Sequence, residues 1–161
     1  MSSPVVKTGF MLEDVEKGFI LQQVNCQGKM GSGIALAIKT KWPIVEQEYH
    51  EFCRTRPPAL LLSQILPIQV EPGKWIINLF SQLTYGRNPA AQPGGRYTSY
   101  DALADAAKRT ADFANTLAPD YPTINYPMIG CGLGGGDWTI VSAILNSRFD
   151  KMDHCYWEYK P

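Results

Sequence analysis

Apolar runs alternate with helix-like periodicities along most of the chain. Six short apolar runs predict β-strands, at residues 5–10, 19–25, 60–70, 75–80, 123–129 and 155–159. The run 75–80 is apolar almost without alternation, which is typical of a central strand that is buried on both faces. Pro67 lies in the run 60–70 and favours an edge strand or an interrupted strand there, because proline cannot donate a hydrogen bond to a neighbouring strand.

Helical periodicities separate these runs and cover residues 32–41, 43–56, 98–117 and 137–149. The third helical stretch starts with Thr98-Ser99-Tyr100-Asp101, which resembles a capping box with aspartate in its last position. The polar connection over residues 81–97 is longer than most loops, which favours a functional role. Strands that alternate with helices predict a single α/β domain over residues 1–161, with helices on both faces of a parallel or mixed sheet.

Two glycine-rich loops each follow an apolar run and precede a helical pattern. The first loop is Gly28-Lys29-Met30-Gly31-Ser32-Gly33-Ile34-Ala35, and the second loop is Gly130-Cys131-Gly132-Leu133-Gly134-Gly135-Gly136-Asp137-Trp138. Glycine lets the main chain approach a ligand closely, and N–H groups at the start of a helix bind phosphates. Ligands of α/β sheets bind at the carboxyl ends of strands. We therefore expect both loops to hold one pyrophosphate in one pocket.

Charge and composition narrow the class of ligand. Fifteen basic residues balance fifteen acidic ones, so a dedicated nucleic-acid binder is not expected. No stretch approaches the ~18 apolar residues that a membrane helix needs. The cysteines show no Cys-x-x-Cys spacing and only two histidines are present, so we expect no metal site and no cofactor. Free thiols without a signal peptide predict a reduced, cytoplasmic protein, and we expect it to be a monomer.

The glycine loops do not match the common nucleotide motifs. After Gly31-Ser32-Gly33, a dinucleotide fingerprint requires a third glycine where this chain has Leu36. No Gly-Lys-Ser/Thr opens a helix, so a P-loop is excluded, and the Gly-x-Ser-x-Gly nucleophile elbow is absent around Ser32. A generic NAD or nucleoside triphosphate site is therefore not predicted.

The stretch from Val24 to Ala35 resembles the first ligand loop of macro domains, which bind ADP-ribose, and Pro127 to Trp138 resembles their second. The match is strongest to the branch that contains the yeast-type ADP-ribose-1″-phosphate phosphatase and the terminal ADP-ribose glycohydrolases. The resemblance implies a three-layer α/β/α sandwich with a mixed sheet of about six strands. It also implies an ADP-ribose derivative as ligand. The implied reaction is hydrolysis of ADP-ribose-1″-phosphate, with removal of ADP-ribose from macromolecules, or binding without catalysis, as alternatives.

The same resemblance implies the site residues. Asn25 and Gln82 are the candidate catalytic residues. The candidate ligand-binding residues are Gly9, Phe10, Met11, Asn25, Gly28, Met30, Gly31, Ser32, Gly33, Ile34, Ala35, Phe80, Ser81, Gln82, Arg87, Gly130, Cys131, Gly132, Leu133, Gly134, Gly135 and Gly136.

Departures from the branch bear on the chemistry. A lysine follows the central strand of the glycohydrolases, and an aspartate lies in their second loop; this chain has Ser81-Gln82 and Gly134 there. Gln22 stands where the phosphatase has a histidine. The acidic residue that often contacts adenine is absent after Gly9, so the Phe10 backbone or Asp14 would replace it.

Several residues have two interpretations. Asn25 either positions the distal ribose or an attacking water, or it only makes hydrogen bonds to the backbone of the loop. Asp137 is either a general base or, as we favour, the N-cap of the last helix. Arg87 clamps a terminal phosphate or is a solvated loop charge. Six other residues also have two interpretations, and for each we favour packing or another structural role over a role at the ligand. They are Cys26, Cys131, His50, His154, Tyr156 and Trp157.

Overall fold

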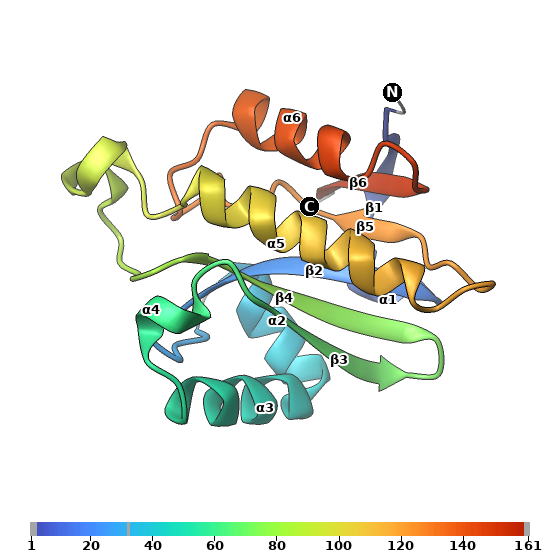
Figure 1. The fold of residues 1–161 in the computed structure, drawn as a ribbon, viewed down its shortest axis with the longest axis horizontal. Coiled ribbons are helices and arrows are strands. Elements are labelled where there is room, and N and C mark those ends of the chain that lie inside the picture. Colours follow the sequence, from blue (N-terminus) through green and yellow to red (C-terminus); the bar gives the residue numbers. More distant parts are fainter. Residues whose placement is uncertain (1–2, 32, 160–161) are drawn as a thin grey trace.

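The computed structural model describes residues 3–31 and 33–159, and its strands form one mixed sheet (Figure 1). The strands are β1 (Val5–Gly9), β2 (Gly18–Asn25), β3 (Ile65–Glu71), β4 (Lys74–Gln82), β5 (Ile124–Tyr126) and β6 (His154–Tyr159). Their order across the sheet is β1-β6-β5-β2-β4-β3. Only the pair β3–β4 is antiparallel among these described strands. The predicted mixed sheet is confirmed, and β3, which contains Pro67, lies at its edge.

Helices cover both faces of this sheet. They are α1 (Met11–Asp14), α2 (Gly33–Lys41), α3 (Pro43–Arg54), α4 (Pro58–Leu61), α5 (Tyr100–Asn115) and α6 (Trp138–Arg148), with two 3₁₀ turns, η1 (Pro89–Ala91) and η2 (Pro93–Gly95). Buried residues of α2 and α3 pack in one apolar cluster, and those of α5 and α6 pack in another. In Figure 1, α5 crosses in front of the sheet. The three-layer α/β/α architecture is therefore confirmed.

Alternation along the central strands explains why there are two cores. Phe19 and Leu21 of β2 belong to the cluster with α5 and α6, whereas Ile20 and Val24 belong to the cluster with α2 and α3. Successive side chains of a strand point to opposite faces, so a strand buried on both faces supplies both layers. At ~25 cal/mol per Å² of apolar area, this double burial is the main stabilising contribution to the fold.

The structure corrects three boundaries of the predicted elements and adds one short helix. The run 60–70 begins later as a strand, because Pro58 starts the short helix α4 and the strand starts at Ile65. The strand predicted at 123–129 ends at Tyr126, before Pro127. Ser99, not Thr98, caps α5, since its hydroxyl oxygen accepts from the Ala102 N–H at 3.2 Å. The short helix α1 was not predicted.

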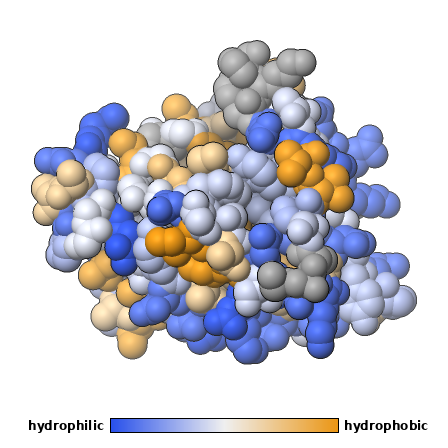
Figure 2. Space-filling view, turned by 90° about the horizontal axis from the view of Figure 1, so that it is seen from above, coloured by the Kyte–Doolittle hydropathy of each residue, from blue (hydrophilic) through white to orange (hydrophobic). Residues whose placement is uncertain are grey.

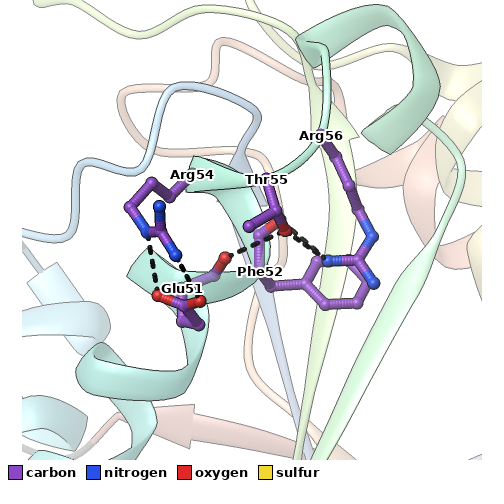
Figure 3. A network of polar contacts seen from close by, with 5 residues as sticks. All are labelled: Glu51, Phe52, Arg54, Thr55 and Arg56. Atoms are coloured by element: carbon purple, nitrogen blue, oxygen red, sulfur yellow. Dashed lines mark hydrogen bonds and ion pairs between the residues drawn. The ribbon is translucent and has the colours of Figure 1, made fainter.

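Helix α3 ends in an exposed polar network (Figure 3). Glu51 accepts two hydrogen bonds from Arg54, at 2.7 and 2.9 Å. The Arg56 guanidinium lies 3.8 Å from the centre of the Phe52 ring and donates to the Phe52 carbonyl. Cations at the end of a helix satisfy its last carbonyls and complement its dipole. Phe52 in turn stacks on Phe80 of β4, which connects this helix end to the central strand.

No helix of the described residues is long and apolar enough to cross a membrane. On the face seen in Figure 2, hydrophobic patches are separated by hydrophilic side chains. The apolar side chains visible on that face therefore form several separate patches.

Candidate functional site

Three adjoining cavities follow the carboxyl ends of the parallel strands. The Asn25 cavity has about 360 Å³ and is lined by Gln23, Val24, Asn25, Lys29, Met30, Gly31, Ala35, Gln82, Tyr85, Gly86, Arg87 and Leu133. The Gly130 cavity has about 760 Å³ and is lined by Gln22, Gln23, Gly33, Ile34, Pro127, Met128, Ile129, Gly130, Gly132, Leu133, Gly134, Tyr156, Trp157 and Glu158. The Phe10 cavity has about 560 Å³ and is lined by Gly9, Phe10, Met11, Leu12, Glu13, Gly33, Ile34, Ala37, Pro127 and Trp157.

Shared walls make these cavities one cleft. Gln23 and Leu133 line both the Asn25 and the Gly130 cavities. Ile34, Pro127 and Trp157 line both the Gly130 and the Phe10 cavities. The cleft therefore runs from Asn25, past both glycine loops, to Phe10.

Asn25 holds the first glycine loop in shape. Its Oδ1 accepts hydrogen bonds from the N–H groups of Gln27 and Lys29, at 3.0 and 3.3 Å, and its Nδ2 donates to the Lys29 carbonyl at 2.8 Å. The buried Tyr49 hydroxyl lies 2.7 Å from the Asn25 carbonyl and 2.9 Å from Oδ1. Burial raises the pKa of the Tyr49 hydroxyl, so it stays a neutral donor. The predicted structural role is thus present, in a residue that also lines the cavity.

The first loop contributes to all three cavities. Met30, Gly31 and Ala35 line the Asn25 cavity, and Gly33 and Ile34 line the other two. Met30, a candidate ligand-binding residue, is buried in the core cluster of α2 and α3. Gly28 lies behind the cleft beside Cys53, with a φ of +77° that favours glycine. Ser32 lies outside the described residues.

The second loop turns back on itself above the carboxyl end of β5. The Gly136 N–H donates to the Gly130 carbonyl at 2.7 Å, and the Gly135 N–H donates to the Gly132 carbonyl at 3.0 Å. Gly130, Gly132, Leu133 and Gly134 line the Gly130 cavity, whereas Cys131, Gly135 and Gly136 do not line any of these three cavities.

A polar network joins the end of β4 to the second loop. Gln23 accepts from the Ser81 hydroxyl at 2.7 Å and donates to Gln82 Oε1 at 2.7 Å and to Thr98 Oγ1 at 3.0 Å. Thr98 donates in turn to the Gly130 carbonyl at 2.8 Å. Gln82 lines the Asn25 cavity. Ser81, like Phe80, is fully buried behind the cavity.

Lys29 and Arg87 are the charged residues that line the Asn25 cavity. Both side chains are exposed, so they lie at its rim. No carboxylate or imidazole of the described residues lines this cavity. The cavity therefore combines a neutral floor of amides with a positive rim, which suits an anionic group.

The Phe10 cavity has aromatic and apolar walls. Phe10 is 53% exposed, and its backbone N–H donates to Asp14 Oδ2 at 3.1 Å. Trp157 is buried, and its indole N–H donates to Asn125 Oδ1 at 2.8 Å. Trp157 therefore has the predicted packing role in the core, and it also lines the cleft.

The thiols near the loops are protonated at neutral pH. Burial raises the pKa of the Cys26 thiol to about 12, with a smaller contribution from Cys53. Burial also raises the pKa of the Cys131 thiol to about 11, and the Asp137 carboxylate adds to that shift. The thiolate is the nucleophile, so these cysteines are suited to packing rather than to catalysis.

The remaining titratable candidates have structural partners. Asp137 caps α6, because its Oδ1 accepts from the Thr139 N–H at 2.8 Å. The His154 Nδ1 lies 2.8 Å from the Tyr126 hydroxyl in a buried pair, and His50 is exposed on α3. Neither histidine lines any of the three cavities. Within 3–31 and 33–159, no group of three or more His, Cys, Asp or Glu residues could hold a metal ion.

Sequence reasoning missed Gln23, Tyr49 and Thr98 as residues that organise the site. One signal was available: Gln22 and Gln23 are adjacent polar residues in the otherwise apolar run 19–25, directly before a glycine loop. The partners of Gln23 lie 58 to 75 positions further along the chain, so no local pattern identifies them.

Comparisons with known proteins agree with this architecture. The chain is 27% identical to the ADP-ribose 1″-phosphate phosphatase of Candida albicans over 138 residues, which is 85% of each protein. It is also 27% identical to the DNA ADP-ribosyl glycohydrolase of Mycobacterium tuberculosis over 135 residues, which is 83% of this chain and 35% of that protein. Its fold matches a macrodomain protein from Streptomyces coelicolor with a TM-score of 0.77 at 24% identity, over 99% of this chain and all of that one.

The model of the Macro domain family matches residues 22–145, which contain both glycine loops and the strands β3, β4 and β5 between them. This match covers most of the chain, and the structural likeness extends over the rest of it. The chain therefore belongs to the Macro domain family.

Proposed function

We propose that this macro domain binds ADP-ribose along the cleft and hydrolyses ADP-ribose-1″-phosphate. The observation that carries the proposal is the single cleft of three chambers with both glycine loops at its centre. In the proposed arrangement, adenine occupies the Phe10 cavity and the diphosphate faces the loop N–H groups of the Gly130 cavity. The distal ribose occupies the Asn25 cavity.

Charge at the Asn25 end supports a 1″-phosphate as the group that reacts. Lys29 and Arg87 line that end of the cleft, and guanidinium groups bind phosphate through paired N–H donors. Relatives named ADP-ribose 1″-phosphate phosphatase align over most of this chain, which supports the same substrate. The Phe10 cavity offers the Phe10 ring and Trp157 to the adenine in place of an acidic side chain.

The proposed reaction is attack of water on the phosphorus of the 1″-phosphate. The bond from phosphorus to the 1″ oxygen breaks, inorganic phosphate leaves, and a proton returns to the 1″ oxygen to give ADP-ribose. Asn25 Nδ2 and Gln82 Nε2 each retain one N–H for the ribose or the water, while the rim cations stabilise the developing charge. Because no carboxylate or imidazole of the described residues lines the cavity, we expect a slow reaction.

That same lack of an acid or base in the cavity favours a second candidate, a domain that binds ADP-ribose without hydrolysing it. Release of ADP-ribose from a macromolecule is a further alternative, which relatives named DNA ADP-ribosyl glycohydrolase support. This chain has Ser81-Gln82 and Gly134 where that branch has a lysine and an aspartate, which weakens this alternative.

Three measurements on the purified chain separate the candidates. Calorimetry with ADP-ribose, phosphate release from ADP-ribose-1″-phosphate, and release of ADP-ribose from a mono-ADP-ribosylated macromolecule are compared. Phosphate release with ADP-ribose binding is the expected result. Binding without turnover of either substrate selects the non-catalytic candidate, and release from the macromolecule alone contradicts the phosphatase proposal.

A pair of variants tests where the diphosphate binds. Gly132 is exposed, and a Cβ built there meets no atom within 4 Å, so a side chain fits without strain. Gly132→Glu should weaken ADP-ribose binding at least tenfold, because a carboxylate would face the diphosphate. Gly132→Gln has the same size without the charge and should lose distinctly less affinity. Equal affinity of wild type and Gly132→Glu would place the ligand elsewhere.

A further inference from the structure

Gln23 occupies the junction between two chambers of the cleft. It lines both the Asn25 and the Gly130 cavities, and it is half-buried near the end of β2. Its carboxamide contacts Ser81 and Gln82 at the end of β4 and Thr98 directly before α5. Through Thr98 it also connects to Gly130 of the second loop. One side chain thus joins three segments that are far apart in the sequence.

Backbone carbonyls determine the direction of every hydrogen bond in this network. The Gly130 carbonyl can only accept, so Thr98 donates its hydroxyl proton to it and must accept from Gln23 Nε2. The second hydrogen of that nitrogen goes to Gln82 Oε1. Independently, the Thr84 carbonyl accepts from Gln82 Nε2 at 2.8 Å, which again leaves Oε1 of Gln82 as the acceptor. The Gly130 carbonyl at one end of the network and the Thr84 carbonyl at the other therefore require the same orientation of the Gln23 and Gln82 carboxamides.

A β-bulge brings Gln82 to Gln23. Val24 pairs with Phe80, but Asn25 pairs with Gln82, so Ser81 is an extra residue in β4. A bulge changes the direction of the side chains that follow it. Ser81 keeps the direction of the α5 face and reaches Gln23 Oε1, and Gln82 is turned so that it also reaches Gln23.

The second loop leaves room for this network only because residue 134 has no side chain. A Cβ built on Gly134 would lie 2.5 Å from Thr98 Oγ1 and 2.9 Å from Gln23 Nε2. The N–H groups of Tyr97 and Thr98 also converge on the Gly134 carbonyl, at 2.8 and 3.1 Å. Gly134 therefore closes directly over the Gln23 carboxamide.

We infer that Gln23 is a positioning residue of the ligand site: it sets the Gln82 carboxamide in the Asn25 cavity and the conformation of the second loop in the Gly130 cavity. The effect on a ligand rests on the proposed function, because the two cavities are assigned there to the distal ribose and the diphosphate. The effect on the loop rests on the network alone. Gln23 thereby couples the two halves of the site.

Binding measurements test the effect on the ligand. Gln23→Met has nearly the same length and volume but no amide, and Gln69→Met makes the same change at an exposed position of β3. ADP-ribose and ADP, which lacks the distal ribose, are titrated into each variant by calorimetry at 25 °C. Gln23→Met should lower the affinity for both ligands about tenfold or more, since the variant loses hydrogen bonds to both halves of the site.

Three further variants, at Gln82 and Thr98, separate the two arms of the network. Gln82→Met should weaken the binding of ADP-ribose but leave the binding of ADP unchanged. Thr98→Val should weaken the binding of both ligands, whereas Thr98→Ser, which keeps the hydroxyl, should bind both as the wild type does. Gln69→Met should match the wild type. A Gln23→Met protein that is folded and binds both ligands within twofold of wild type would overturn the inference, even if its melting temperature has fallen.

A measurement without ligand keeps the inference testable if the proposed function fails. In ¹H–¹⁵N spectra, Gln23→Met and Thr98→Val should shift the amide signals of residues 130–136, and Thr98→Ser and Gln69→Met should not. Gln23→Met should also shift the side-chain NH₂ signals of Gln82. Shifts confined to residues next to position 23 contradict the inference. Absence of ADP-ribose binding by wild type, with these loop shifts present, contradicts only the proposed function and the ligand part of the inference.

Discussion

At the scale of single residues, polar side chains around the cleft make hydrogen bonds to the protein's own backbone. Asn25 has three hydrogen bonds to the loop that follows it, and Asp137 satisfies the first turn of α6. Unsatisfied N–H groups at a helix start are costly, so a short acceptor directly before the helix is stabilising. A polar residue beside a glycine loop can thus be required for the local structure even if it takes no part in catalysis.

Asp137 offers a test of that distinction at the residue scale. Asp137→Asn keeps an oxygen that accepts from the Thr139 N–H, so stability should stay within about 0.5 kcal/mol of wild type. Asp137→Ala removes the cap and should lower the free energy of unfolding by about 1 kcal/mol. Urea unfolding measures both effects. If Asp137 is only a cap, phosphate release by Asp137→Asn equals that of wild type. A large loss of turnover in this variant, with stability retained, would instead identify a base.

At the scale of elements, the contacts of each glycine in the second loop, and not the number of glycines, decide which positions tolerate a side chain. Its glycines are not equivalent. Gly132 faces open space, whereas a Cβ on Gly134 would lie within 3 Å of Thr98, Gln23 and the Gly130 carbonyl. Since neither residue has a positive φ, the difference between them is one of packing and not of backbone conformation.

This difference predicts unequal costs for the same substitution. Gly134→Ala should lower the free energy of unfolding by about 1–3 kcal/mol, because the added methyl group overpacks the loop. Gly132→Ala should change it by less than about 0.5 kcal/mol. Urea unfolding of the two variants beside wild type provides the comparison. Equal costs at both positions would contradict the described packing of Gly134 over Gln23.

At the scale of the whole molecule, the parallel strands β2 and β5 are neighbours in the sheet, and each leads into a glycine loop. Their carboxyl ends meet at the same edge, which places the two loops on either side of one cleft. Helices of both layers start there, α2 in the last residues of the first loop and α6 at the last residue of the second. The site is therefore a property of the assembled sheet and not of either loop alone.

A ligand that contacts both loops and the Phe10 cavity should stabilise the whole domain. At a free ADP-ribose concentration of 100 times its Kd, the expected stabilisation is about 2.7 kcal/mol. For a chain of 161 residues this corresponds to a rise in melting temperature of roughly 5–10 °C. Scanning calorimetry at several ligand concentrations measures the rise. Gly132→Glu at the same ADP-ribose concentration serves as control and should show a distinctly smaller rise, whereas an equal rise would contradict binding at the second loop.

Local patterns in the sequence were sufficient for the layered architecture, the edge position of β3, the Asp137 cap of α6 and both glycine loops. Each of these depends on residues that are close in the sequence: the alternation of a strand, the periodicity of a helix, a proline, or a short acceptor before a helix. The boundaries at Leu61, Ser99 and Tyr126 were less predictable, because a neighbouring proline or a competing hydroxyl decided them.

The tertiary structure alone decided how the two loops are joined. The register of β2 against β4, with its bulge at Ser81, brings Gln82 to Gln23, and the start of α5 brings Thr98 to the same carboxamide. These partners are separated by 59 and 75 positions, and no periodicity extends over such a distance. The sequence by itself predicted two glycine loops at the carboxyl ends of strands and a pyrophosphate-containing ligand for them. Strand pairing and side-chain packing determined the polar network between those loops, because only the folded sheet brings its members within hydrogen-bond distance.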